Sequence, residues 1–352
     1  MAKRARVPDS AETDRVEGAA HPRQTTRLIG QNAALGIVSR AIRGRRPPQA
    51  WLMCGPPGVG KATLAYRIAR YLLAYGASDR GPADLGVPPN DPVSVQVAAG
   101  SHPGVLVVKR SINPDTGKLR NETVVDDVRR LSSFFGLTSG AGGWRVVIVD
   151  TADDMNASAA NALLKLLEEP PSRAMLLLLS NVPGRLLPTI RSRCQRLSLR
   201  LLSDADMEGE LSRLLPDMNA TERASLTRLS GGSIGAALRL AGGEGVTLAQ
   251  DAARLVDLSG QPDIPALFAL ADRLVRITDG LDMLGEFLIQ TLTDRVRARA
   301  LAGQPAMNKW ADALESLRRS FARTGALNLD PRQTLLSAAR ELNATARRAG
   351  PL

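Results

Sequence analysis

Between Trp51 and Leu64 an apolar run is followed by a loop of glycines and prolines that ends at a lysine. The segment reads WLMCGPPGVGKATL, and a helical pattern begins at Lys61. Backbone N–H groups of such a loop, the amino end of the next helix and the lysine ammonium all attract phosphate. We therefore expect a strand, a phosphate-binding loop and a helix. The residues expected to contact a nucleotide here are Gly55, Gly58, Val59, Gly60, Lys61, Ala62 and Thr63.

The residue after the lysine departs from this motif. The motif places Ser or Thr there, because the hydroxyl holds Mg²⁺, whereas this chain has Ala62. Thr63 comes one position later and points elsewhere on a helix. We therefore predict no metal site and no required cofactor. The loop still permits weak ATP binding without hydrolysis.

A second element of such folds is an acid at the end of a neighbouring strand, which holds Mg²⁺ through water. The apolar run 145–150, RVVIVD, places Asp150 there. In proteins that hydrolyse nucleotide the next residue is usually a glutamate that orients water, but here it is Thr151. Asp153 and Asp154 follow in a turn, and we interpret them as solvated acids at a helix amino end.

Apolar strands alternate with helical patterns as far as residue 200. Fully apolar strands in such an order predict a parallel sheet covered on both faces. Strands are expected at 51–54, 105–108, 145–150, 175–180 and 194–199. Helices are expected at 32–43, 61–74, 124–135 and 156–169, and 186–193 reads as a short helix or turn. Residues 77–104 lack periodicity and predict an irregular insertion, and from about 201 onward only helical patterns follow.

Composition excludes several classes of function. The chain has 352 residues, 44% of them hydrophobic, so it can bury a core without disulfides or cofactors. Aromatic residues are 3%, which argues against stacking platforms for single-stranded nucleic acid. Two cysteines alone cannot form a structural zinc site, and they favour a reduced, cytoplasmic chain. No apolar run is long enough to span a membrane. Two explanations of the net charge of +11 are equally good: contact with a nucleic acid or another acidic partner, or a coding bias that produces scattered arginines.

Two further motifs identify a family. Residues 161–171 read NALLKLLEEPP, and a buried strand, Asn181 and then TIRSRC at 189–194 follow. In these residues the chain resembles the clamp-loader branch of the AAA+ ATPases. The resemblance covers the α/β part well and the next helices moderately. It covers the C-terminal part only by helical character and length.

The resemblance implies an α/β fold with three domains. A flexible basic tail at 1–24 would precede an AAA+ domain at 25–200 with a P-loop and a parallel sheet. A small helical lid domain at 201–245 and an all-α C-terminal collar domain at 246–352, which joins subunits, would follow.

The resemblance also implies roles for single residues. Arg193, in the Ser-Arg-Cys motif, would be an arginine finger that reaches the γ-phosphate held by a neighbouring subunit. The alternative is that it pairs with a local carboxylate. Asn181 matches a polar sensor of the γ-phosphate. A second sensor, an arginine, is expected after Gly232-Ser233, but its position holds Gly235, and Arg239 comes only one turn later.

Three catalytic positions are thus altered together, namely Ala62, Thr151 and Gly235. This combination predicts a subunit that does not hydrolyse its own nucleotide but keeps Arg193 for its neighbour. Its implied partners are gamma/tau motor subunits and a delta subunit in a five-membered ring, with the sliding clamp and primed DNA reached through the complex. The alternative is an active ATPase of the gamma/tau kind, or another AAA+ ATPase, with Thr63 supplying the hydroxyl. No zinc is expected, since 77–104 has no cysteine, and a free DNA-binding protein driven by charge is a weaker third hypothesis.

Overall fold

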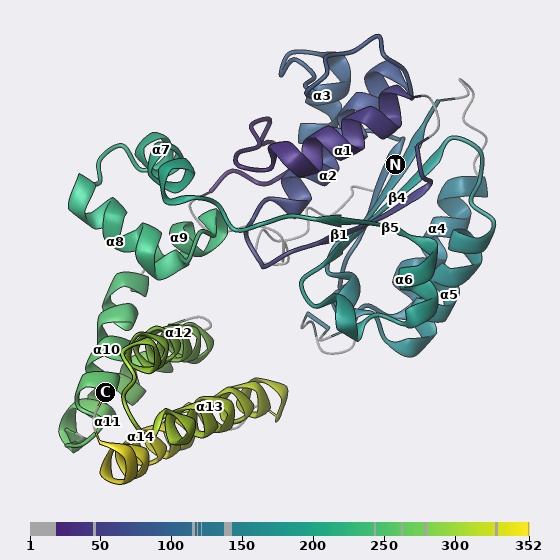
Figure 1. Ribbon diagram of the computed structural model, residues 1–352. Coiled ribbons are helices and arrows are strands. Elements are labelled where there is room, and N and C mark those ends of the chain that lie inside the picture. Colours follow the sequence, from purple (N-terminus) through teal and green to yellow (C-terminus); the bar gives the residue numbers. More distant parts are fainter. Residues whose placement is uncertain are drawn as a thin grey trace. The chain divides into compact units, whose positions relative to one another are not determined.

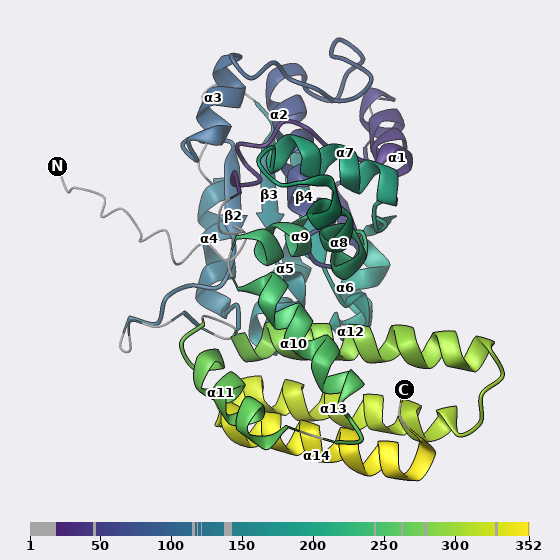
Figure 2. The same cartoon turned by 90° about the vertical axis from the view of Figure 1, so that its left-hand side faces the viewer.

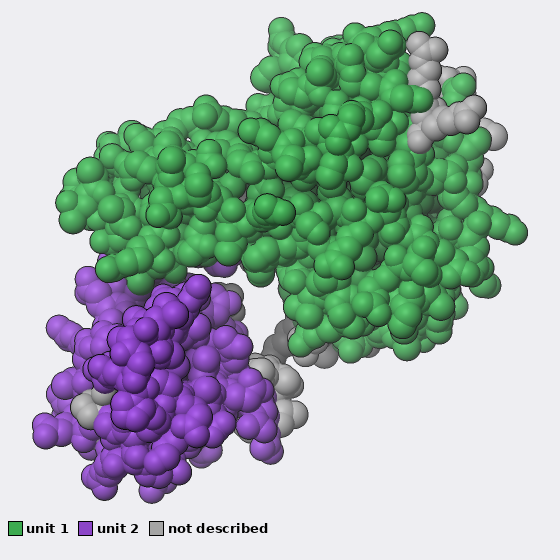
Figure 3. All heavy atoms as spheres, viewed as in Figure 1, with its two compact units in different colours: residues 1–238 green, residues 239–352 purple. Residues whose placement is uncertain are grey.

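The structure is a computed structural model that divides into two compact units, Met1–Leu238 and Arg239–Leu352 (Figure 3). It describes residues 19–44, 47–114, 117, 119–120, 122–136, 143–242, 244–261, 263–277, 280–327, 330–350 and 352. Most of the tail predicted at 1–24, residues 1–18, lies outside the described residues.

A parallel sheet forms the centre of the first unit, as the apolar runs predict. Its strands lie in the order β2-β3-β4-β1-β5. They span Ala50–Cys54 (β1), Val105–Val108 (β2), Arg145–Val149 (β3), Ala174–Ser180 (β4) and Gln195–Ser198 (β5). Every residue of β1 and β4 is buried, because helices cover the sheet on both sides. The predicted α/β fold is therefore confirmed.

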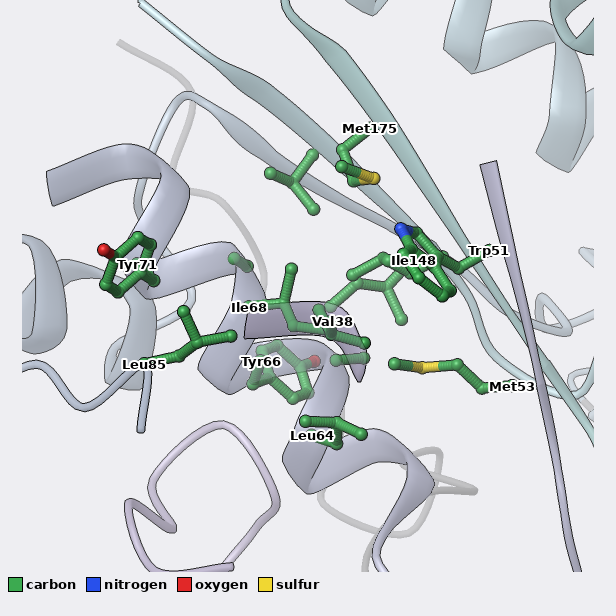
Figure 4. Close-up of a cluster of buried hydrophobic side chains, with 14 of the residues drawn as sticks. Val38, Trp51, Met53, Leu64, Tyr66, Ile68, Tyr71, Leu85, Ile148 and Met175 are labelled. Carbon is green, nitrogen blue, oxygen red and sulfur yellow. The ribbon is translucent and has the colours of Figure 1, made fainter. Parts of the chain in front are cut away.

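Helices from two parts of the chain cover the two faces (Figure 1). Helices α1 (Asn32–Arg43), α2 (Lys61–Tyr75) and α3 (Pro92–Ala98) lie on one face. Helices α4 (Val125–Gly136), α5 (Ala157–Glu168) and α6 (Pro188–Arg193) lie on the other. Figure 4 shows Leu64 and Ile68 of α2 within the cluster that includes Trp51, Ile148 and Met175 of the sheet. This packing fixes the start of α2, and thus the end of the glycine-rich loop.

Helix α3 corrects the prediction that residues 77–104 are irregular throughout. The Asp91 side chain accepts a hydrogen bond from the Val93 amide at 2.8 Å, and Pro92 occupies the first turn. Both features favour a helix start. The helix has only seven residues, too few for its apolar positions to form a recognisable period.

The segment before α1 is attached to α2. His21 is buried, although it falls within the predicted tail. Arg70 of α2 is also buried, and its guanidinium donates to the carbonyl groups of Arg23 and Thr25. Arg67 donates to the carbonyl of Thr26 at 2.6 Å. Residues 21–26 are therefore held by two arginines of the helix that follows the loop.

Only helices follow β5 in the part of the chain that the structure describes. They are α7 (Asp204–Leu214), α8 (Ala220–Ser230), α9 (Ile234–Ala241), α10 (Gly245–Asp257), α11 (Ile264–Leu274), α12 (Gly280–Leu301), α13 (Met307–Leu327) and α14 (Pro331–Ala349). Within the second unit α12 packs on α10 and α13, and α13 packs on α14 (Figure 2). No helix in the described ranges has both the length and the apolar character of a membrane span.

Candidate functional site

The loop after β1 has the backbone conformation of a phosphate cradle. Gly58 and Gly60 have φ values of 75° and 100°, in the left-handed region that glycine adopts without strain. Gly60 directly precedes α2, so the amino end of that helix faces the loop. Such a turn can direct successive N–H groups toward an anion. The sequence therefore predicts this strand, loop and helix correctly.

Lys61 contacts the loop itself. Its Nζ donates to the carbonyl oxygens of Gly55 and Pro56, each at 2.7 Å. Burial lowers the pKa of Lys61 to about 8, while the nearby charges of Asp153 and Asp150 act in the opposite direction. The structure thus brings Asp150 and Lys61 together, as the motifs predict. An ammonium has three N–H groups, so these two contacts leave one donor for a phosphate.

The residues of this site do not fit a magnesium-bound nucleotide. Ala62 packs against the apolar cluster of the α1–α3 face and offers no oxygen to a metal. Thr151 follows Asp150 with a φ of 52°, a left-handed conformation that is unusual for a β-branched residue. Its side chain is a hydroxyl where a carboxylate would orient water. We derive no hydrolytic step through this loop.

Asp153 is not the solvated acid that the sequence suggests. Its carboxylate accepts hydrogen bonds from Ser180 Oγ at 2.6 Å, from the Asn181 amide, and from the Val182 amide at 3.1 Å. It therefore fixes the carboxyl end of β4, where Asn181 was predicted as a sensor. Sequence analysis missed this role because the partners lie 27 to 29 residues away.

Asp154 does not cap the following helix either. It forms an ion pair with Arg110 at 3.4 Å, and burial raises its pKa. The amino end of α5 is capped by Asn156, whose side chain accepts from the Ala159 amide at 2.9 Å. The prediction of two solvated cap acids is therefore wrong for both residues.

The start of α9 lies directly against the loop. Ser233 Oγ donates to the carbonyl of Pro57 at 2.9 Å, and the Gly235 amide donates to the carbonyl of Gly58 at 3.1 Å. A Cβ atom on Gly235 would lie 2.7 Å from the Cα of Gly58. No side chain fits there in this arrangement. Position 235 is the one predicted to have lost a sensor arginine.

Gln31 also holds the loop, which sequence analysis did not anticipate. Its Nε2 donates to the carbonyls of Val59, at 3.2 Å, and Arg200, at 2.7 Å, and its Oε1 accepts from the Arg200 amide. Together with Lys61, Ser233 and Gly235, it provides a donor for every carbonyl group from residue 55 to residue 59. The loop is therefore bound to both the segment after β5 and the start of α9.

Arg239 comes one turn after the expected sensor position, and its charge affects the carboxyl group of Glu286. Burial raises the pKa of Glu286 in α12, and the charge of Arg239 acts in the opposite direction. Both residues belong to the second unit. This geometry gives no support to Arg239 as a displaced phosphate sensor.

Arg193 ends helix α6, and its side chain is 37% exposed. Its Nη2 lies 3.0 Å from Glu168 Oε1, and its Nη1 donates to the Thr189 carbonyl at 3.2 Å. The local carboxylate partner that we considered as an alternative is thus present. Because the pair is largely solvated, it leaves the guanidinium accessible.

Arg193 and the glycine-rich loop lie at opposite ends of the sheet. Strand β5 runs parallel to β1, with Gln195 beside Trp51 and Ser198 beside Cys54. The loop follows Cys54 at the carboxyl end, whereas Arg193 precedes Gln195 at the amino end. Since each strand residue adds about 3.3 Å, Arg193 is too far away to contact a phosphate bound in its own loop.

Comparison with known proteins identifies relatives of the first unit. Residues 30–203, which contain the loop and Arg193, match a family described as DNA polymerase III, delta subunit. A DNA polymerase III subunit delta' of Pseudomonas aeruginosa is 41% identical over 193 residues, 55% of this chain and 56% of the relative. A DNA polymerase III subunit gamma/tau of Mycobacterium bovis is 27% identical over 349 residues, 88% of this chain and 56% of the relative. The chain thus spans about half the length of the curated relatives it matches.

Among solved structures, a DNA polymerase III gamma subunit-related protein from Thermotoga maritima has a TM-score of 0.44 and 19% identity. The match covers 89% of this chain and 99% of that one.

Substitution of Gly235 by alanine tests the contact between the loop and α9. We expect Gly235→Ala to lower the free energy of unfolding by about 1–3 kcal/mol, because the added methyl group must displace Gly58. Helix propensity alone predicts the opposite sign. Chemical denaturation would measure the change, with Gly184→Ala as control, since a methyl group there meets nothing within 4 Å. Equal stability of the two variants would contradict the close contact.

Proposed function

Since residues 30–203 match the DNA polymerase III delta subunit family, we propose that this chain is a delta'-type subunit of a bacterial clamp loader. It acts in DNA replication in the cytoplasm and does not hydrolyse its own nucleotide. It supplies Arg193 to the ATP site of a neighbouring subunit. The neighbours are motor subunits of the gamma/tau kind and a delta subunit, in a five-membered ring that places a sliding clamp on primed DNA.

The separation of Arg193 from its own loop is the observation that carries this proposal. The guanidinium lies at the amino end of the sheet and is partly exposed, so its charge is available to another molecule. A planar, permanently charged fork of donors is suited to the charge that develops on a transferred phosphoryl group. The chemical step would take place on the neighbour, and this chain would contribute one cation to it.

The chain's own loop has a structural role in this proposal. Its carbonyl groups bind Lys61, Gln31 and the start of α9, so the loop connects the sheet to the helices after β5. Weak phosphate binding would use the third N–H group of Lys61, since two are donated to Gly55 and Pro56.

The competing function is an active motor subunit. The gamma/tau relative aligns with 88% of this chain and therefore favours it. In that case Thr63 would have to supply the hydroxyl that Ala62 lacks.

Turnover by the isolated chain distinguishes the two functions. We expect the purified protein to release no phosphate from Mg-ATP above the background of a Lys61→Ala variant, because the metal hydroxyl and the water-orienting acid are both absent. A coupled phosphate assay with and without primed DNA would measure this. DNA-stimulated turnover that Lys61→Ala abolishes would establish the motor function instead.

Removal of Arg193 tests the action on a neighbour. In the reconstituted complex, Arg193→Ala should leave assembly unchanged but slow hydrolysis at the adjacent site by about 10³-fold, the lower end for arginine fingers. Single-turnover hydrolysis and size-exclusion chromatography would measure the two effects. Arg191→Ala, which removes an exposed arginine two residues earlier, serves as control. Wild-type rates in the Arg193→Ala complex would contradict the proposed role.

Any phosphate binding by the loop should depend on the protonation of Lys61. Its pKa is lowered to about 8, so the ammonium is charged below that pH and loses its proton above it. We expect the affinity for ATP, measured by equilibrium dialysis without metal, to fall as the pH rises through 8. Lys61→Arg should remove this inflection, because arginine stays charged. An unchanged pH profile in Lys61→Arg would show that another group controls binding.

A further inference from the structure

Arg193 has an anionic partner within its own chain. Glu168 is the last residue of α5, and its Oε1 lies 3.0 Å from Arg193 Nη2. The carboxyl end of a helix carries partial negative charge, which adds to the attraction. Glu169 is the next residue, and no ion pair of its carboxylate is found among the described residues. One carboxylate of this adjacent pair is therefore directed at the guanidinium.

The ion pair between Arg193 and Glu168 is weak enough for another anion to replace Glu168. The side chains of Arg193 and Glu168 are 37% and 50% exposed, so water competes with their contact. A cavity of about 330 Å³ adjoins the guanidinium, and Leu166, Pro170 and Gln195 contribute to its lining. The guanidinium can therefore change partner without displacing the core of the domain.

We propose that Glu168 is a positioning residue that competes with the neighbour's phosphate for Arg193, an inference that rests on the proposed function. Carboxylate and phosphate bind the same fork of guanidinium N–H groups, so a phosphate bound in a bidentate manner competes with Glu168 for the N–H groups of Nη2. In the free chain Glu168 occupies that donor, while Nη1 binds the Thr189 carbonyl. In the complex the phosphate replaces Glu168, and the contact with Thr189 continues to orient the side chain. Glu168 thus reduces the affinity of Arg193 for phosphate.

Neutralisation of Glu168 should strengthen the response to ATP in the reconstituted complex. The free energy of an exposed ion pair changes an equilibrium constant by a factor of at most about five. We therefore expect Glu168→Gln to lower the ATP concentration for half-maximal turnover by about two- to fivefold. The maximal rate should not change, since Arg193 makes the same contact with phosphate once Glu168 is displaced. Added salt should reduce the difference, because it screens the exposed charges. A purely structural role would not produce this separation of the two kinetic constants.

Glu169→Gln is the matched control, since it removes the same charge one residue later. We expect it to behave as the wild type. Equal shifts in Glu168→Gln and Glu169→Gln, or a lower maximal rate in Glu168→Gln, would overturn the inference. If Glu168→Gln matches the wild type while Arg193→Ala slows hydrolysis, the competition is refuted and the proposed function stands. If Arg193→Ala also has no effect, the proposed function itself fails.

Discussion

The parallel pairing of β1 with β5 determines where Lys61 and Arg193 can act. Because both strands run in the same direction, the loop that follows β1 and the helix that precedes β5 lie at opposite ends of the sheet. Lys61 belongs to the first end and Arg193 to the second. The sheet therefore separates a site that could hold phosphate from a side chain that could assist its transfer. Under the proposed function, Arg193 therefore acts on a phosphate held by a second domain and not on one in its own loop.

Two of the positions that lack catalytic groups, and one acid near the loop, have structural roles in this chain. Ala62 contributes its methyl group to the core beneath α2, and Gly235 allows α9 to approach the loop. Asp153 uses its charge to hold the end of β4. Each contact is made within the first unit. The loop thus connects the sheet to α9, and Lys61 holds two of its carbonyl groups.

Local sequence patterns predicted the elements but not the contacts between them. The strands were predictable because buried parallel strands are continuous apolar runs, and the loop because its glycines and Lys61 have fixed spacing. The contacts of Gln31 with Arg200 and of Asp153 with Ser180 span 169 and 27 residues, so no local pattern encodes them. Helix α3 was missed because seven residues are too few to reveal a period. The position of Arg193 followed from a family motif, whereas its pairing with Glu168 required the fold.

The contact of Gly58 with Gly235 also bears on how this domain could change over many generations. An arginine restored at position 235 by one mutation would meet the backbone of Gly58 before it could extend toward a phosphate. Lineages that acquire it would first have to separate α9 from the loop and lose the hydrogen bonds made by Ser233 and Gly235. Intermediate sequences would then have neither a stable connection nor a working sensor. The close packing of Gly58 and Gly235 therefore disfavours an arginine at position 235 unless α9 has first moved away from the loop.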